Sequence, residues 1–346
     1  MRAVAQRIIR EEAKLSWQNF CEDLNDKDNI SKVWKMAAKM DGKRQKRSTS
    51  DLIVNGEKIT DDQEKANVLG QHFAKVSSNE NLEEPFSSIK KIIEHGMKGK
   101  IEMNKKNDED TENNGINSPI NFYELEAAIN KSNRNSAPGE DQISYTMLKN
   151  LPRKSRAVLL KLFNMAWQQQ KIPSKWKEAI IIPFPKINKD ATDPGSYRPI
   201  ALTSCIGKLL ERIVVNRLNW QLEKLGILNP DQSGFRAHHS TEDNIAKLQD
   251  AITKAKANKN KLLAVFVDFE KAYDMVWRTG ILIKLREYGI SGNIFAYIKN
   301  FLADTFIQVK YNGQKSEKYR LHNGVIQGSV LSPLLFLVAI NDINKK

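Results

Sequence analysis

The sequence is poor in the residues that cross-link a protein or embed it in a membrane. Its two cysteines, Cys21 and Cys205, lie far apart and match no metal-binding spacing, so a reducing compartment without structural disulfides is expected. No apolar run approaches the roughly 20 residues that span a bilayer. The charged stretch 1–20 also lacks the apolar core of a signal peptide. We therefore expect an intracellular protein of the cytoplasm and nucleus, neither secreted nor held in a membrane.

The sequence lacks the residue patterns of a serine hydrolase site and of a zinc site. There is no Gly-x-Ser-x-Gly elbow and the five histidines are scattered, which argues against a Ser–His–Asp hydrolase. His238 and His239 are adjacent and have no third ligand nearby, so they do not match the spacing of a zinc site.

Acidic residues are outnumbered, with 41 Asp and Glu against 55 Lys and Arg and a formal net charge of +14. Such a surplus favours a polyanionic partner, nucleic acid or an anionic membrane surface, although a solvated basic surface remains open. Lys186 and Arg198 lie in Pro-rich loops beside aromatic residues, which suits contact with a nucleic-acid backbone and stacking on bases. The cations of the helix that follows, Lys208, Arg212 and Arg217, fit a solvated helix face.

Three regions differ in texture. Residues 1–76 are predicted to be mostly helical, with helical periodicity over 1–42 and a short hairpin with Asn55-Gly56 as its turn. Residues 77–118 are polar, charged and rich in Asn, which predicts a linker, disordered around 104–117. Residues 119–346 are dense in apolar side chains and mix helical and strand patterns, which predicts an α+β domain.

Within the dense region, LLAVFVDF (262–269) is a nearly continuous apolar run that predicts a buried central strand ending in Asp268. A carboxylate at a strand end is a hard-oxygen ligand suited to Mg²⁺, and a second acid, Asp274, follows. The alternative is that Asp268 only caps the helix beginning near Lys271.

A polar loop flanked by glycines, NGVIQGSVLSP (323–333), enters an apolar helix. A helix N-terminus with Gly on each side of Gln327 offers bare amides and close backbone approach, which suits a nucleotide or phosphate. An ordinary turn with an N-cap serine is the alternative reading.

Five segments follow one another in order: WKEAIIIPFPK, DPGSYRPIALTSCIGKLLERIVVNRL, QSGFRAHHST, LAVFVDFEKAYDMVW and NGVIQGSVLSPLLF. Together they resemble the successive fingers and palm motifs of reverse transcriptases, in particular the non-long-terminal-repeat, LINE-type enzymes of the jockey-like group. The resemblance is strong over 119–346 and looser over 1–118, which is similar to the segment that joins an endonuclease to the polymerase. It implies the fingers and part of the palm of a right-hand polymerase, preceded by a mostly helical N-terminal segment.

The resemblance implies a reacting centre at Asp268. This residue would be the catalytic carboxylate that bridges two metal ions, Mg²⁺ or alternatively Mn²⁺, with the backbone carbonyl of Phe269 as a further ligand. Tyr273 would screen the sugar 2′ position of the incoming dNTP.

It also implies contacts with the substrates, an RNA template, a DNA primer and dNTP. Gln327 and Gly328 match the motif that contacts the incoming nucleotide and the template. Lys186 and Arg198 match the cations that hold the triphosphate and the template backbone. The oligomeric state is not indicated.

Two departures from the family pattern bear on activity. Ile326 stands where the family usually has proline, which puts the geometry of the Gln327 loop in question. The sequence stops at AINDINKK, where the family continues to the hairpin with the paired catalytic aspartates. We therefore expect a polymerase fragment that is inactive alone.

Two alternatives stay open. The chain could be a non-catalytic nucleic-acid-binding remnant, or a domesticated module of that kind. It could also be a structural helical protein with incidental motifs, which is tested by whether 262–269 and 305–322 form one sheet.

Overall fold

The computed structural model describes residues 50–103 and 115–343, together with Glu11, Leu15 and Gln18. Residues 1–51 and 52–346 form separate compact units, and the second is the one described below. The helices predicted for residues 1–42 and most of the disorder predicted around 104–117 lie outside the described residues.

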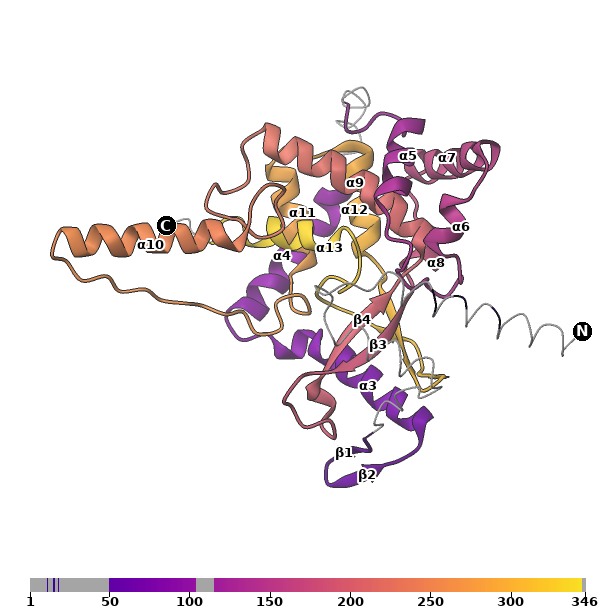
Figure 1. Ribbon diagram of the computed structural model, residues 1–346, viewed down its shortest axis with the longest axis horizontal. Coiled ribbons are helices and arrows are strands. Elements are labelled where there is room, and N and C mark those ends of the chain that lie inside the picture. Colours follow the sequence, from indigo (N-terminus) through magenta and orange to yellow (C-terminus); the bar gives the residue numbers. More distant parts are fainter. Residues whose placement is uncertain (1–10, 12–14, 16–17, 19–49, 104–114, 344–346) are drawn as a thin grey trace, which may run out of the picture. The chain divides into compact units, whose positions relative to one another are not determined.

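Helices and strands both occur in the second unit, as the α+β class requires (Figure 1). The first elements are β1 (Leu52–Val54), β2 (Glu57–Ile59), α3 (Asp62–Val76), η1 (Asn79–Asn81), α4 (Phe86–Met103) and α5 (Phe122–Lys131). Next come α6 (Tyr145–Lys149), α7 (Arg153–Gln168), α8 (Ser174–Lys177), β3 (Ala179–Pro185), η4 (Pro194–Ser196), β4 (Tyr197–Leu202) and α9 (Cys205–Lys224). The last are α10 (Thr241–Ala257), α11 (Arg278–Glu287), α12 (Gly292–Leu302), β5 (Phe306–Tyr311), β6 (Gln314–Lys315), β7 (Tyr319–Arg320) and α13 (Ser332–Ile340).

Two Asn-Gly pairs turn the chain, the first of them as the sequence predicts. Asn55 and Gly56 join β1 to β2, and Asn312 and Gly313 join β5 to β6. All four residues have positive φ, the conformation that a two-residue hairpin turn requires and that Asn and Gly adopt most readily. Local turn chemistry is therefore sufficient to place both hairpins.

The larger sheet has the order β4-β3-β5-β6, with β7 also paired to β5. β3 runs antiparallel to β4, with Phe184 opposite Arg198, and parallel to β5. Helix α3 packs on this sheet (Figure 1), where Leu69 and Phe73 share a buried cluster with Ile181 and Val309. The segment AIIIPFP is thus the strand β3, which has a partner on each side.

A second and larger core joins the helices. It is built around α9, whose Leu210 and Leu218 are fully buried, and it includes Phe163 and Trp167 of α7 and Leu335 of α13. None of the described helices is long and apolar enough to span a bilayer.

The strand predicted for 262–269 is wrong. These residues have no regular secondary structure, and Leu263 and Phe266 are 88% and 84% exposed. A strand needs neighbours that satisfy its backbone hydrogen bonds, and composition cannot supply them. In the described sheet the inner strand β5 already pairs with β3, β6 and β7, and on the outer strand β4 Ala201 donates its backbone N–H to the Gln327 carbonyl. The single sheet expected to join 262–269 with 305–322 is therefore not formed.

Part of the region predicted as a linker, 77–118, is helical. Helix α4 covers residues 86–103, beginning with apolar residues at helical spacing, Phe86, Ile89 and Ile93. Lys90 on the same helix is buried. The average composition of the region is polar, but the region contains an amphipathic helix that tertiary contacts stabilise. The division of the chain at residues 76 and 118 remains a prediction.

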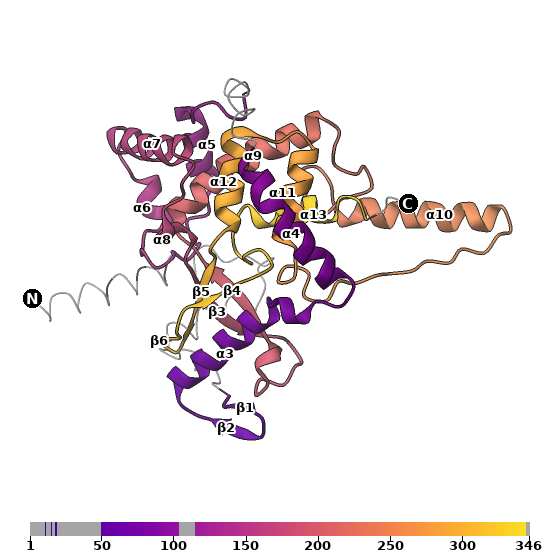
Figure 2. The same ribbon diagram turned by 180° about the vertical axis from the view of Figure 1, so that it is seen from behind.

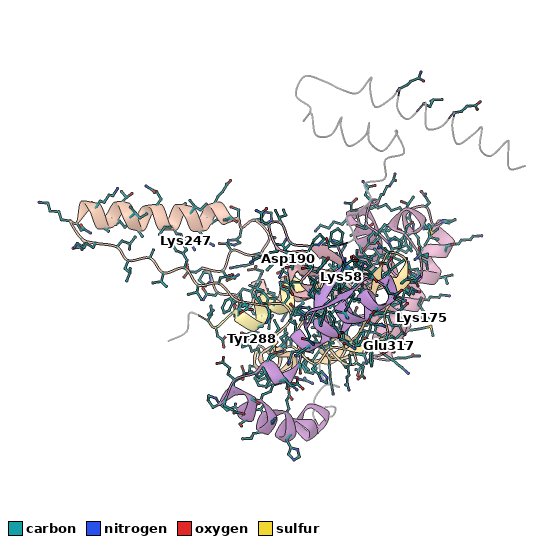
Figure 3. All side chains as sticks on the ribbon, turned by 90° about the horizontal axis from the view of Figure 1, so that it is seen from below. Lys58, Lys175, Asp190, Lys247, Tyr288 and Glu317 are labelled. Atoms are coloured by element: carbon teal, nitrogen blue, oxygen red, sulfur yellow. The ribbon has the colours of Figure 1, made fainter. Side chains whose placement is uncertain are left out.

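Helix α10 differs from the other long helices because none of its residues is buried. Figure 3 shows its side chains, Lys247 among them, standing clear along its length. It leads directly into the exposed run 262–269.

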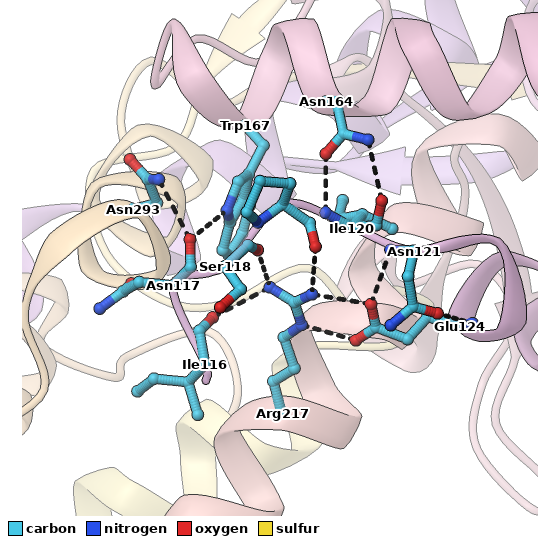
Figure 4. Close-up of polar contacts among 11 residues, drawn as sticks. Ile116, Asn117, Ser118, Ile120, Asn121, Glu124, Asn164, Trp167, Arg217 and Asn293 are labelled. Carbon is cyan, nitrogen blue, oxygen red and sulfur yellow. Dashed lines mark hydrogen bonds and ion pairs between the residues drawn. The ribbon is translucent and has the colours of Figure 1, made fainter. Parts of the chain in front are cut away.

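Arg217 of α9 contacts the residues that lead into the helical core (Figure 4). Its side chain is 8% exposed, so the prediction that it lies on a solvated helix face is wrong. Its Nε and Nη2 donate to the two carboxylate oxygens of Glu124 at 2.6 and 2.7 Å. The remaining N–H groups donate to the backbone carbonyls of Ile116, Ser118 and Pro119. The guanidinium therefore fixes the approach to α5 through charge-assisted, bidentate bonds.

Replacing Arg217 with methionine should lower the free energy of unfolding by about 3 kcal/mol, because it leaves the Glu124 carboxylate and three carbonyls without their donor. Lys224→Met, an exposed change at the end of the same helix, should cost less than about 1 kcal/mol. Urea unfolding followed by circular dichroism measures both. Equal losses in the two variants would contradict the role of Arg217.

The same pair predicts sensitivity to acid. Burial raises the pKa of Glu124, but the hydrogen bonds from Arg217 and Asn121 outweigh it and leave that pKa below its usual value of 4.5. The ion pair therefore stabilises the fold above about pH 4.5, and this contribution is lost as the pH falls further. Urea midpoints should drop more steeply below about pH 4.5 for the native chain than for Glu124→Gln. Parallel curves would refute the prediction.

Candidate functional site

The residues predicted to react lie in an exposed stretch. Asp268 and Phe269 belong to the run without regular structure, and the Phe269 side chain is 47% exposed. Among the described residues, no group of three or more His, Cys, Asp or Glu side chains could hold a metal ion. Asp268 and the Phe269 carbonyl therefore do not complete a metal site with the other described residues.

A few residues later, at Tyr273, the chain packs against other segments of the protein. The Tyr273 ring stacks on Phe336 of α13 with centroids 5.1 Å apart and an angle of 15° between the planes. Phe235 meets both rings edge-on. Burial raises the pKa of the Tyr273 hydroxyl. An aromatic cluster from three separate segments thus fixes the side chain that the motifs assign to the nucleotide sugar.

Lys186 comes close to this segment from the β3–β4 hairpin. Burial raises the pKa of Asp274, while the positive charges of Lys186 and Lys271 lower it. The Lys186 ammonium also donates to the Gly195 carbonyl at 2.8 Å, within its own hairpin. The structure therefore brings Lys186 and Asp274 into one electrostatic neighbourhood, with His72 of α3 near Lys186 and Lys271 as well.

Arg198 is exposed on β4, opposite Phe184. Both predicted cations of this region thus belong to one hairpin, but Lys186 is tied to the backbone of its tip while Arg198 faces solvent.

The Gln327 loop, residues 321–331, runs along the outer edge of β4. Ala201 donates its backbone N–H to the Gln327 carbonyl at 2.8 Å. Gly328 has φ +130°, and a Cβ there would lie 2.4 Å from the Ala201 carbonyl oxygen. Only glycine fits this approach, so both predicted residues are held by their backbone and remain exposed.

The same loop is joined to the segment of Tyr273. Val325 donates its N–H to the Tyr273 carbonyl at 2.8 Å, and Gly324 donates to Val276 at 2.8 Å. Gly324 has φ +80°, and a Cβ there would lie 2.5 Å from the Asp274 carbonyl oxygen. Two of the motifs, separate in sequence, are therefore assembled by backbone contacts.

Ile326, which replaces the proline of the family pattern, is 7% exposed and packs in the core between α3 and the sheet. Its burial anchors the loop to the sheet by side-chain packing.

The expectation that the loop presents bare helix N-terminal amides to a ligand is wrong. Glu211 of α9 is 3% exposed and accepts hydrogen bonds from the Ser329 hydroxyl at 2.7 Å and from the N–H groups of Val330 and Leu331 at 2.7 and 3.2 Å. A carboxylate of the protein thus takes the place that an anion would occupy before α13.

Sequence reasoning missed Glu211. The available signal was its position in LLERIVV, where an acid falls among the apolar residues that face the core of a predicted helix. A carboxylate on a buried face needs donors, and the amides before another helix are suitable ones.

A cavity of about 490 Å³ lies beside this assembly, between residues 269–277, α11 and α13. Its lining includes Phe269, Met275, Lys284, Phe336 and Asp342.

Comparisons with known proteins bear on residues 185–346, which match the family "Reverse transcriptase (RNA-dependent DNA polymerase)". The chain is 35% identical over 225 residues to the probable RNA-directed DNA polymerase from transposon BS of Drosophila melanogaster, covering 65% of this chain and 25% of that protein. It is 32% identical over 226 residues to the RNA-directed DNA polymerase from mobile element jockey of the same species, with the same coverage.

A third relative matches more of the chain. The putative 115 kDa protein in type-1 retrotransposable element R1DM of Drosophila melanogaster is 26% identical over 292 residues, which is 83% of this chain and 25% of that protein. The chain therefore spans about a quarter of the length of these curated relatives. The resemblance inferred from the ordered motifs is confirmed.

Glu211→Leu should lower the free energy of unfolding by about 3 kcal/mol, since it leaves one hydroxyl and two amides buried without an acceptor. Glu211→Gln keeps an accepting oxygen and loses only the charge, so it should cost about 1 kcal/mol. Urea unfolding measures both values. Equal costs for the two variants would mean that the carbonyl oxygen at this position does not hold the loop.

Proposed function

We propose that the chain, whose residues 185–346 match the reverse transcriptase family, forms part of an RNA-directed DNA polymerase of a jockey-like retrotransposon. Its region 119–346 would supply the fingers and part of the palm. The substrates would be an RNA template, a DNA primer and dNTP, and the reaction would take place inside the cell.

One structural observation carries the proposal. The hydrogen bond from the Val325 N–H to the Tyr273 carbonyl joins two segments that the motifs independently assign to one nucleotide pocket. A sugar-screening aromatic residue and a nucleotide-contacting loop must be adjacent for either to act, and this contact supports that arrangement.

In the proposed reaction the primer 3′-hydroxyl attacks the α-phosphorus of the dNTP, forming the new P–O bond as pyrophosphate leaves. Such chemistry depends on positioning and on neutralising charge. Gln327 and Gly328 would orient the base pair being formed, and Tyr273 would exclude a 2′-hydroxyl. Lys186 and Arg198 would neutralise triphosphate and template charge.

A divalent metal, Mg²⁺ or Mn²⁺, is implied by the family. Asp268 and the Phe269 carbonyl would be this chain's ligands, but the described residues offer no three-ligand group to accompany them. Further ligands must then come from elsewhere, so we assign no step of the reaction to a metal in this chain alone.

The exposed run 262–269 also indicates that the proposed reacting centre needs additional structure around it. Six of its eight side chains are large, apolar and exposed, a composition that becomes stable when both faces of a strand are covered. We infer that this run becomes a paired strand when additional strands cover it, and that pairing then orders Asp268.

A non-catalytic nucleic-acid-binding protein is the second candidate. It is favoured by the β3–β4 hairpin, on which Arg198 is exposed to solvent and Lys186 lies at the tip. Both candidates predict binding of a template–primer duplex that weakens as salt increases.

Primer extension tests whether the chain is inactive alone. The 346-residue chain should bind an RNA template with a DNA primer but should not extend it in Mg²⁺ and dNTP. Extension by this chain that Asp268→Ala abolishes would contradict the expectation that it is inactive alone.

A chimera supplies the positive test. We would fuse the chain to the part of the jockey enzyme that follows its matching region, and this chimera should extend the primer. Asp268→Ala should reduce extension at least about a hundredfold, because it removes a carboxylate of the proposed reacting centre. Glu270→Ala, an exposed acid two residues away, is the matched control and should retain activity. Binding without extension by a folded chimera would favour the second candidate.

A further inference from the structure

We propose that Lys90 and Arg278 are positioning residues that hold the entrance of the Gln327 loop, so that helix α4 is a working part of the nucleotide pocket. The inference rests on the proposed function only in taking Gln327 as a nucleotide contact. Neither residue belongs to the motifs that identified the family, and Lys90 lies outside the region that matches it.

Lys90 is 4% exposed, although lysine is rarely buried to this extent. Its ammonium donates to the side-chain oxygens of Asn79 and Asn323, and the Glu94 carboxylate lies 3.9 Å away. Burial lowers the pKa of Lys90, while Glu94 raises it. A buried ammonium is costly unless such oxygens surround it, so its position requires these partners.

Asn323 uses every one of its polar groups. Its backbone N–H and its side-chain amide both donate to the Ser77 carbonyl, at 3.1 and 3.0 Å, and the amide also donates to Asn79 at 2.9 Å. Its side-chain oxygen accepts from Lys90, and its carbonyl accepts from Arg278. The residue is 2% exposed, so its conformation is determined from all sides.

Arg278 holds the backbone on the other side of Asn323. Its Nε donates to the Gly324 carbonyl at 2.7 Å and Nη2 to the Asn323 carbonyl at 3.1 Å. Nη1 donates to the carbonyls of Leu302 and Leu321. Burial lowers the pKa of this guanidinium to about 10. Its planar fork thus orients several carbonyls at once in a fixed geometry that a lysine ammonium does not have.

Helix α4 is locked to the same region by further contacts. The Glu94 carboxylate accepts from the Trp277 indole N–H at 2.9 Å and from the Thr279 hydroxyl at 3.2 Å. Phe86 meets the Trp277 ring edge-on, with centroids 5.6 Å apart. In Figure 2, α4 is seen passing in front of α11, whose first residue is Arg278.

The Gln327 loop is therefore fixed at both ends, by Lys90 and Arg278 at its entrance and by Glu211 at its exit. Between these anchors the Gln327 side chain is exposed while its carbonyl is bound to β4. A contact residue on a backbone fixed in advance loses little freedom when a ligand binds. This gives α4 a role in nucleotide affinity without any contact to the nucleotide.

Hydrogen–deuterium exchange on the 346-residue chain tests the inference. Lys90→Met should accelerate exchange of peptides covering 321–331 about tenfold, because a charge-assisted anchor is lost. Peptides covering 179–198, in the sheet and apart from the Ala201 bond to the loop, should exchange as in the native chain. Lys91→Met, a change of the exposed neighbouring lysine on the same helix, should leave both regions unchanged.

Arg278→Lys provides a second variant that retains the charge but loses the planar fork, and it should also accelerate exchange of the loop. Native exchange of 321–331 in both folded variants would overturn the proposal, as would equal acceleration in 179–198. If Lys90→Met does not fold, native exchange in Arg278→Lys overturns it.

The chimera allows the same inference to be tested by the kinetics of primer extension. There, Lys90→Met should raise the KM for dNTP several-fold more than it lowers kcat, since it loosens a contact loop and leaves Asp268 in place. A chimera that never extends a primer would count against the proposed function, while the exchange experiment would still decide whether α4 holds the loop.

Discussion

The buried carboxylate of Glu211 joins the parts of this molecule that matter for its site. It lies on α9, the helix around which the larger core is built, and it accepts three hydrogen bonds from the residues just before α13. Negative charge is stabilised at a helix N-terminus by the free N–H groups and the helix dipole. The position of the Gln327 loop relative to the core follows from this contact, and with it the direction in which Gln327 is presented.

Seen from this anchor, the pocket is assembled mainly by backbone. Ala201 bonds Gln327, Val325 bonds Tyr273, and two glycines allow approaches that a Cβ would prevent. Side chains act around this frame, with Ile326 packed into the core and Phe336 stacked on Tyr273. Variation in exposed side chains would therefore change what is bound more readily than where it is bound.

The features that the sequence predicted correctly are those determined within a few residues. The Asn-Gly hairpins depend on local φ preferences, and the long amphipathic helix α9 depends on its own periodicity. The order of the motifs predicted the match of residues 185–346 to the reverse transcriptase family because it combines many such local patterns.

The wrong predictions concern segments whose structure depends on contacts with residues distant in sequence. Residues 262–269 have the composition of a buried strand, but no neighbour in the described sheet covers them. Arg217 and Glu211 look like ordinary helix charges until α5 and the Gln327 loop are placed beside them. The polar region after residue 77 contains a helix whose buried Lys90 has partners in Asn79, Glu94 and, 233 positions away, Asn323.

The exposed run 262–269 has a consequence for the protein in solution. It combines β-branched, aromatic and leucine side chains with a single charge and no proline, the composition from which cross-β stacks of identical segments form. Molecules with this surface uncovered can pair with copies of themselves, edge to edge, at concentrations where a closed sheet would stay monomeric. Self-association through Leu263, Phe266 and their neighbours thus competes with the pairing of this run into a sheet. Any strand that covers these side chains prevents self-association and at the same time places Asp268.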